Sequence, residues 1–125
     1  MNTTRQERGR DAWRTGHRTE LLAGLFLRLK GFRILARRFA CHVGEIDIVA
    51  KRGRLVVFVE VKYRADPDIA AAAVTNRQWQ RVTRTAEVFM PSRPGLASFD
   101  RRFDLLVFSR RNHFDANRHL SIIRR

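Results

Sequence analysis

Two acidic side chains and one lysine occupy positions from which they could act on the same ligand. Glu60 and Lys62 lie two residues apart at the end of the apolar run Leu55–Lys62, so in an extended strand they point to one face. Asp47 lies in the preceding apolar segment, and a hairpin that pairs the two segments in register brings it to the same end. Two carboxylates beside a lysine form a hard oxygen site that suits Mg²⁺ or Mn²⁺. The backbone carbonyl of Val61 is a further expected ligand.

Such a site predicts hydrolysis of phosphodiester bonds. Asp47 and Glu60 would hold the metal ion, which polarises the scissile phosphate and lowers the pKa of a bound water. Lys62 would orient that water or stabilise the charge that develops on the phosphate. The alternative is structural: Glu-x-Lys is a common tripeptide, and Lys62 could simply form a salt bridge with one of the two carboxylates at a strand end.

A helix is expected ahead of these strands, over Asp11–Lys30, with Gly31 as its stop signal. One side of this helix carries small residues, among them Gly24, which would allow close approach of a neighbour. Because the other side is strongly apolar, we expect a helix that is covered on both sides. The apolar stripe consists of Leu21, Leu22, Leu25, Phe26 and Leu29.

Three strands are then expected in succession, over Phe32–Phe39, Glu45–Ala50 and Leu55–Lys62. The turn Lys51–Arg54 joins the last two as a hairpin. Strand alternation on the second strand places Ile46 and Ile48 together on the face opposite Asp47. The third strand is apolar on both faces over most of its length, which predicts a central strand covered on each side.

The second half of the chain predicts one more helix and further strands. Thr75 and Gln78 have the spacing of a capping box, and a helix is expected from there to Met90. Another strand is expected over Phe103–Phe108, with a short last one over Leu120–Ile123. The order helix, three strands, helix, strand predicts an α/β fold with a central mixed sheet flanked by helices.

Size and charge limit the classes of function. The 125 residues are enough for one domain, which we expect over residues 10–125 after a flexible basic segment, residues 1–9. The formal charge of +14 predicts a polyanionic partner, DNA before RNA. Since 23 of the 26 basic residues are arginine, a general preference for arginine is the competing explanation.

Other classes are disfavoured. The longest apolar stretch, Leu21–Leu29, is interrupted by Arg28 and is far too short to span a membrane. The single cysteine, Cys41, cannot form an internal disulfide, which fits a cytoplasmic protein. No sequence-reading module such as a zinc finger is visible, so nucleic acid would be bound through its backbone or shape.

The sequence resembles the bacterial YraN family of endonuclease-like proteins, within the PD-(D/E)XK superfamily that includes restriction endonucleases and Holliday-junction resolvases. The resemblance implies a restriction endonuclease-like core and nucleic-acid binding. It also implies a first-helix carboxylate at the metal, for which Glu20 is the candidate; the alternative is an exposed helix glutamate. Gln78 stands where relatives often carry a lysine. The residues that carry the resemblance are Gly44–Asp47, Val57–Lys62, Ala73–Thr75 and Arg102–Asp104, within a match from about Gly16 to Phe108.

Residues around the site are candidates for contacts with nucleic acid or for support. Asp104 is expected either to support the metal site or, with more weight, to hydrogen bond to a neighbouring turn. Glu45 is expected to be a solvated or hydrogen-bonded turn residue directed away from Asp47. A phosphate-binding rim is expected from Arg37, Arg38, Arg64, Arg77, Gln78 and Arg81.

Three functions follow from these residues. The first is a Mg²⁺- or Mn²⁺-dependent endonuclease that acts on DNA. The second is a non-catalytic module that binds nucleic acid with the same fold. The third is a subunit of a larger DNA-processing assembly, with homodimerisation also open.

Overall fold

The structure is a computed structural model that describes residues 18–63 and 75–108 and the backbone of residues 120–124. The order of helices and strands is the one expected from the sequence. Residues 1–9 and the part of the expected first helix before residue 18 lie outside the described residues. The elements are a helix over residues 18–29, β1 (Arg33–Cys41), β2 (Gly44–Arg52), β3 (Leu55–Tyr63), α3 (Asn76–Phe89), the 3₁₀ turns η1 (Met90–Ser92) and η2 (Pro94–Leu96), β4 (Asp100–Phe108) and β5 (Leu120–Arg124).

The strands form one mixed sheet in the order β1-β2-β3-β4-β5. β1, β2 and β3 pair antiparallel, β3 and β4 pair parallel, and β5 returns antiparallel to β4. The strand that carries Glu60 and Lys62 is therefore in the middle of the sheet, as its apolar sequence predicted. The parallel pair requires a crossover, and α3 lies within that connection.

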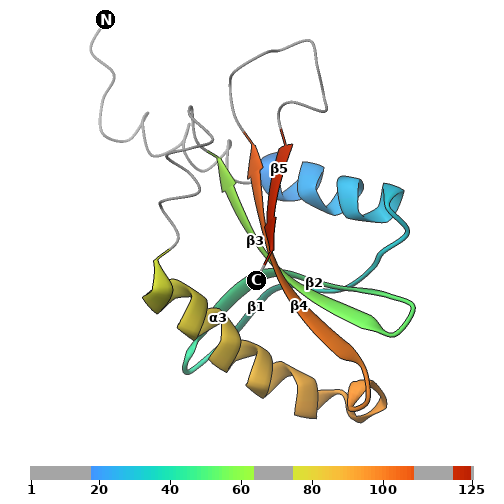
Figure 1. The fold of residues 1–125 in the computed structure, drawn as a ribbon, viewed down its shortest axis with the longest axis vertical. Helices are drawn as coiled ribbons and strands as arrows, with labels where there is room; N and C mark the ends of the chain where they lie inside the picture. Colours follow the sequence, from blue (N-terminus) through green and yellow to red (C-terminus); the bar gives the residue numbers. More distant parts are fainter. Residues whose placement is uncertain (1–17, 64–74, 109–119, 125) are drawn as a thin grey trace, which may run out of the picture.

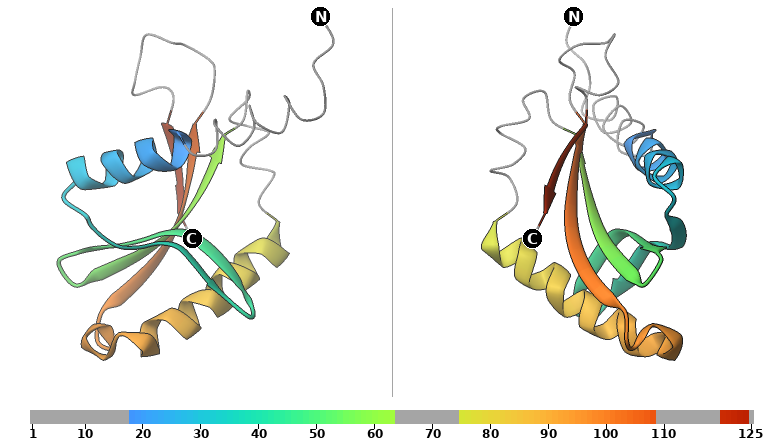
Figure 2. Two further views of the ribbon diagram at one scale, coloured as in Figure 1. Left: turned by 180° about the vertical axis from the view of Figure 1, so that it is seen from behind. Right: turned by 45° about the vertical axis from the view of Figure 1, so that its right-hand side comes forward.

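The two helices cover opposite faces of the sheet (Figures 1 and 2). Helix 18–29 packs Ala23 and Leu27 on one face, against a cluster that includes Val57 and Val59 of β3. α3 covers the other face, where Phe58 of β3 lies in the core. On that face aromatic rings fill the space between helix and sheet: Phe58 stacks on Phe103 at 5.5 Å and meets Phe89 edge-on at 5.8 Å. The expected α/β class, with β3 covered on both sides, is confirmed.

The end of helix 18–29 and the start of α3 are stabilised by the local hydrogen bonds that the sequence predicted. Gly31 has φ +89°, and the N–H groups of Gly31 and Phe32 donate to the carbonyls of Arg28 and Leu27, which is a Schellman end. At the start of α3, the Thr75 hydroxyl accepts the N–H of Gln78, and the Gln78 side chain accepts the N–H of Thr75. The end of helix 18–29 and the start of α3 are thus both fixed by the sequence around them.

The described residues cover helix 18–29 on one side, and its leucines on the other side are exposed, so the expectation of two covered sides is wrong. Its buried side carries the small residues Thr19, Ala23 and Gly24 together with Leu27. The four leucines of the apolar stripe face outward instead, because the small side allows the closer approach to the sheet, whereas Phe26 packs against the core cluster beneath the helix. Within the described residues, no helix is long and apolar enough to cross a membrane. The exposed leucines are Leu21 (52%), Leu22 (52%), Leu25 (53%) and Leu29 (78%).

The alternation expected for β2 breaks at Asp47. Ile48 packs on the side of helix 18–29, as β2 continues regularly from there to its hairpin turn. Ile46 instead packs with Phe58 on the α3 side, so Ile46 and Ile48 do not share a face. The partner strand is irregular at the same level, since Arg38 of β1 has φ +50°. Figure 2 shows the β1–β2 hairpin curving towards α3.

Replacing Phe58 with alanine tests the core on the α3 face. The ring is fully buried and contacts two other aromatic rings, so we expect Phe58→Ala to lower the free energy of unfolding by about 3–5 kcal/mol. Urea denaturation followed by circular dichroism measures the change. Leu29→Ala is the control, because Leu29 is 78% exposed and its loss should change stability by less than about 0.5 kcal/mol. Equal effects of the two changes would contradict this packing.

Candidate metal and phosphodiester site

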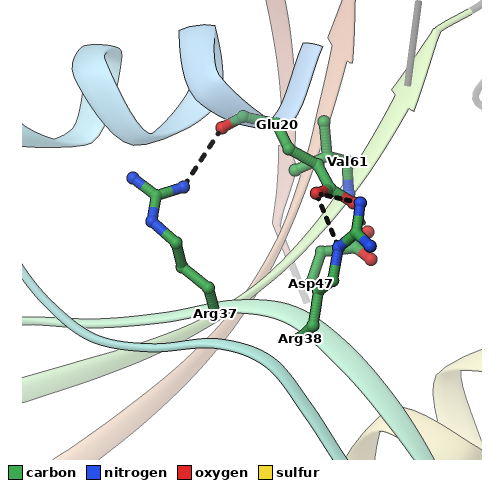
Figure 3. Close-up of polar contacts among 5 residues, drawn as sticks. All are labelled: Glu20, Arg37, Arg38, Asp47 and Val61. Carbon is green, nitrogen blue, oxygen red and sulfur yellow. Dashed lines mark hydrogen bonds and ion pairs between the residues drawn. The ribbon is translucent and has the colours of Figure 1, made fainter. Parts of the chain in front are cut away.

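The site lies where β2 separates from β3. The two strands pair from Arg52–Leu55 to Ile48–Val59, and the same register extended by one residue places Asp47 opposite Glu60. At that point a side chain continues the pairing, because Asp47 Oδ2 accepts the backbone N–H of Val61 at 2.8 Å (Figure 3). The sequence-predicted convergence of Asp47 and Glu60 at one end of the hairpin is therefore what the structure contains.

Both carboxyl groups are held in their neutral form more strongly than usual. Burial, followed by repulsion from Asp47, raises the pKa of Glu60 to about 8, although Lys62 and the backbone of Asp47 act in the opposite direction. Burial also raises the pKa of Asp47, opposed by the hydrogen bond from Val61. Nearby negative charge on Glu20 and Glu45 adds to the effect on Asp47. Two neighbouring carboxylates thus share a partly buried site with too little positive charge.

Lys62 does not supply the missing charge through a direct contact. Among the residues that the structure describes, ion pairs join Arg38 to Glu20 and Arg102 to Asp104, and none joins Lys62 to Glu60 or Asp47. The simple salt-bridge explanation for Glu60 and Lys62 is therefore wrong. Lys62 is near enough to lower the pKa of both carboxyl groups and yet leaves them available to another cation.

A cavity of about 220 Å³ opens in front of Glu60 and Lys62, between the strand ends and α3. Glu45 lines it from β2, and Gln78 and Arg81 line it from the first turns of α3. Gln78 is the residue that closes the capping box, so its backbone is fixed at the helix start. The cavity therefore joins the two strand residues of the candidate site to the N-terminal part of a helix.

Glu20 lies beside the site and is bound to an arginine. Its carboxylate accepts hydrogen bonds from Nε and Nη2 of Arg38, each at 2.9 Å (Figure 3). The Glu20 side chain is 23% exposed and close enough to raise the pKa of Asp47. Glu20 is thus neither a freely exposed helix glutamate nor in the Asp47–Glu60 pair; it forms the outer edge of the same acidic cluster.

The residues of the predicted phosphate-binding rim fall into separate groups. Arg37 and Arg38 both reach helix 18–29, where Arg37 Nη1 donates to the Glu20 carbonyl at 3.5 Å. Gln78 and Arg81 line the cavity, and Arg77 is exposed at the start of α3. Arg64 lies outside the described residues. The structure therefore brings only part of the predicted rim to the cavity.

Sequence reasoning missed the contribution of the β1–β2 hairpin tip. Gly44 packs so closely on α3 that an added Cβ would lie 2.8 Å from the Thr85 hydroxyl oxygen. This contact carries Glu45 into the lining of the cavity beside Glu60. The glycine before Glu45 was the only sequence signal, and it also fits an ordinary turn.

The expected partner of Asp104 was also wrong. Its carboxylate accepts hydrogen bonds from the side chain of Arg102 and not from a neighbouring turn.

The residues present fit a divalent cation with oxygen ligands. Within the described part of the chain, no three His, Cys, Asp or Glu residues gather into a group that could hold a metal. Mg²⁺ requires less, because it retains several waters and is commonly held by one or two carboxylates. Two partly buried carboxylates with raised pKa values provide that donor set, and a cation would relieve their mutual repulsion.

Comparison with known proteins places the chain in a family. A family model described as "Uncharacterised protein family UPF0102" matches residues 19–108. The chain belongs to the UPF0102 family. This is the YraN family that the sequence motifs indicated, and the helix and strand order is compatible with the restriction endonuclease-like core that this resemblance implied.

Several relatives within the UPF0102 family match most of the chain. A UPF0102 protein of Rhodopseudomonas palustris (strain HaA2) is 51% identical over 96 residues, which cover 77% of this chain and 75% of the relative. One of Bradyrhizobium diazoefficiens is 48% identical over 101 residues, 81% of this chain and 76% of the relative. One of Parvibaculum lavamentivorans is 46% identical over 99 residues, 79% and 74% of the two chains.

The raised pKa of Glu60 makes stability depend on pH. The folded protein holds this proton up to about pH 8, whereas the unfolded chain loses it near pH 4.5. The native state therefore binds more protons in this window, and the free energy of unfolding should fall as pH rises from about 4.5 to about 8. In metal-free buffer, we expect Glu60→Gln to match the wild type at pH 4.5 and to melt at least about 4 °C higher at pH 9.

Glu87→Gln is the control for this measurement, because Glu87 is an exposed glutamate of α3 and the change in formal charge is the same. Its melting temperature should follow that of the wild type at every pH. A Glu60→Gln protein that is less stable than the wild type at pH 9 would show that the carboxylate is well compensated in the fold.

Proposed function

We propose that the protein is a Mg²⁺- or Mn²⁺-dependent endonuclease that hydrolyses DNA phosphodiester bonds. The observation that carries this proposal is the proximity of Asp47 to Glu60 where β2 separates from β3, with Lys62 on the same strand as Glu60 and not in an ion pair with either carboxylate. Burial of two like charges is costly unless a cation compensates them. A metal-dependent phosphodiesterase uses such a cation next to the scissile phosphate.

Each residue has a role in this proposal. Asp47 and Glu60 would hold the metal ion, and the ion would supply Lewis-acid polarisation of the phosphate and a water of lowered pKa. The hydrogen bond from the Val61 N–H holds Asp47 Oδ2 in place, and Oδ1 takes no part in that bond. Because the N–H and C=O of one residue in a strand point the same way, the Val61 carbonyl also faces the side of Asp47 and would be the third ligand. Lys62 lies in the cavity, where its ammonium stabilises negative charge on the phosphate.

The cavity and the charge of the chain support DNA as the substrate. Arg81 and the N-terminal turn of α3 present positive charge to the space in front of Glu60. The formal charge of +14 attracts a polyanion over longer distances. We place this activity in the cytoplasm, on DNA bound through its backbone, with a homodimer or larger DNA-processing assembly as possible settings.

A second function, nucleic-acid binding without turnover, is favoured by one observation. Glu20 is engaged by Arg38, so the acidic cluster presents two carboxylates at the strand split and a third that is already paired. Gln78 also offers a neutral amide where a cation would assist phosphate binding. Binding that is strong, salt-sensitive and indifferent to Glu60→Gln, without cleavage, would identify this function.

The metal site can be tested separately from cleavage. We expect Mg²⁺ or Mn²⁺ to raise the melting temperature of the wild type at pH 8 by several degrees when the metal is well above its Kd, and a chelator to reverse the increase. The increase should be smaller at pH 5, where protons compete for Glu60. Asp47→Asn and Glu60→Gln should abolish it, whereas Glu87→Gln should retain it.

Cleavage is tested with supercoiled, linear, single-stranded and branched DNA in either metal. The wild type and Glu87→Gln should cut at least one form, while Asp47→Asn, Glu60→Gln and Lys62→Met should each lower the rate at least 100-fold (on the order of 3 kcal/mol of barrier). If no DNA is cut in either metal, or if activity survives Glu60→Gln, the endonuclease proposal fails.

A further inference from the structure

A second cavity lies on the opposite face of the sheet, beneath helix 18–29, and has a volume of about 250 Å³. Its apolar wall is formed by Leu27 and Phe32, which are both buried, and by Leu106 of β4. Glu60 and Lys62 line the cavity on the α3 side, and none of the candidate endonuclease residues lines this second cavity. The proposed function assigns it no role.

One wall of this cavity carries a buried acceptor. Asp104 is 3% exposed, and Arg102, two residues earlier on the same face of β4, donates to both of its oxygens at 2.9–3.2 Å. The ion pair neutralises the carboxylate where it stands. Each carboxylate oxygen has more than one lone pair, so Asp104 can still accept a hydrogen bond from a ligand that enters the cavity.

Two further cations line the cavity and are exposed to solvent. The Arg52 guanidinium lies over the Phe32 ring at 4.4 Å, and its Nη1 donates to the Lys30 carbonyl at 2.8 Å. The Lys30 ammonium lies 5.6 Å from the Phe26 ring. Within the described residues, no ion pair occupies either cation. Contact with the backbone of Lys30 and with Phe32 holds the guanidinium plane in place at the edge of the cavity.

We infer that this cavity binds a nucleoside phosphate. Lys30 and Arg52 take the phosphate, which they can reach at the exposed edge. The base lies on the apolar wall, and an N–H of the base donates to Asp104. The lining offers cations, an apolar wall and a hydrogen-bond acceptor, and a nucleotide carries the matching anion, flat ring and N–H donors in one small ligand.

Size and charge are consistent with this class of ligand. A volume of about 250 Å³ is slightly below that of typical small-molecule sites, which start at about 300 Å³, so the cavity suits a ligand no larger than one nucleotide. The lining contains three cations and one carboxylate, so an anion is favoured. The nucleotide is either a free mononucleotide or one residue of a nucleic-acid strand that reaches this face.

The chain offers a matched pair of variants for the test. Lys30 and Arg52 line the cavity. Lys51 and Arg54 flank Arg52 in the β2–β3 turn region, but their side chains contact the Phe99 ring and do not line the cavity. Lys30→Gln/Arg52→Gln and Lys51→Gln/Arg54→Gln remove the same formal charge and one cation–ring contact per residue. Calorimetric titration with adenosine 5′-monophosphate, in chelator and low salt, measures binding to the full chain. Lys30→Gln alone is the second variant, because its exposed side chain leaves folding intact.

The expected result is saturable binding of one nucleotide by the wild type, weakened at least tenfold in Lys30→Gln/Arg52→Gln and at least threefold in Lys30→Gln. Lys51→Gln/Arg54→Gln and Glu60→Gln should remain within twofold of the wild type. Insensitivity to Glu60→Gln separates this site from the endonuclease proposal, which can fail without affecting it.

Two outcomes overturn the inference. One is equal weakening in the two double variants, which would mean general attraction by the basic surface. The other is inorganic phosphate binding as tightly as the nucleotide, which would mean that the ring contributes nothing. Competition with a short single-stranded oligonucleotide distinguishes the sources: displacement of the nucleotide identifies a strand, and lack of displacement identifies the free nucleotide.

Discussion

The hydrogen bond from the Val61 N–H to the Asp47 carboxylate is the constraint on which the candidate site depends. Regular pairing of β2 with β3 ends at Ile48–Val59, and beyond it β2 turns towards α3. A backbone N–H left unpaired in a half-buried position costs about 1–3 kcal/mol, and a carboxylate acceptor removes that cost. The same bond brings the Asp47 charge next to Glu60. The same hydrogen bond therefore accounts both for the way β2 separates from β3 and for the proximity of the two carboxylates.

The protein treats buried carboxylates differently on the two faces of its sheet. Asp104 is almost fully enclosed, and the two-pronged contact from Arg102 compensates its charge. Glu60 is enclosed beside another acid, without an ion pair among the described residues, and its pKa rises to about 8. The first arrangement is complete within the fold. The charge at Glu60 is compensated only when a proton or a cation binds there. Uncompensated carboxylates of this kind are typical of ligand-binding and catalytic sites.

The sequence was sufficient wherever the relevant interaction is local. The capping box at Thr75, the Schellman end at Gly31 and the central position of β3 follow from short patterns, and the register of one tight hairpin placed Asp47 near Glu60. It was insufficient where packing between distant segments decides. The outward leucines of helix 18–29, the change of face between Ile46 and Ile48, and the Arg38–Glu20 pair depend on contacts between elements. Alternation and stripe patterns describe one helix or strand at a time, so they do not predict contacts between elements.

The parallel pairing of β3 with β4 also determines the order in which the chain can fold. Every pair in this ladder joins residues that are 45 positions apart, from Leu55–Asp100 to Tyr63–Phe108. The β1–β2 and β2–β3 hairpins close over short turns, so they can form early at a small cost in chain entropy. The β3–β4 contact has to wait for closure of the segment that contains α3. Non-local strand pairing of this kind slows folding, and substitutions in α3 should therefore act on the rate at which the central sheet is completed.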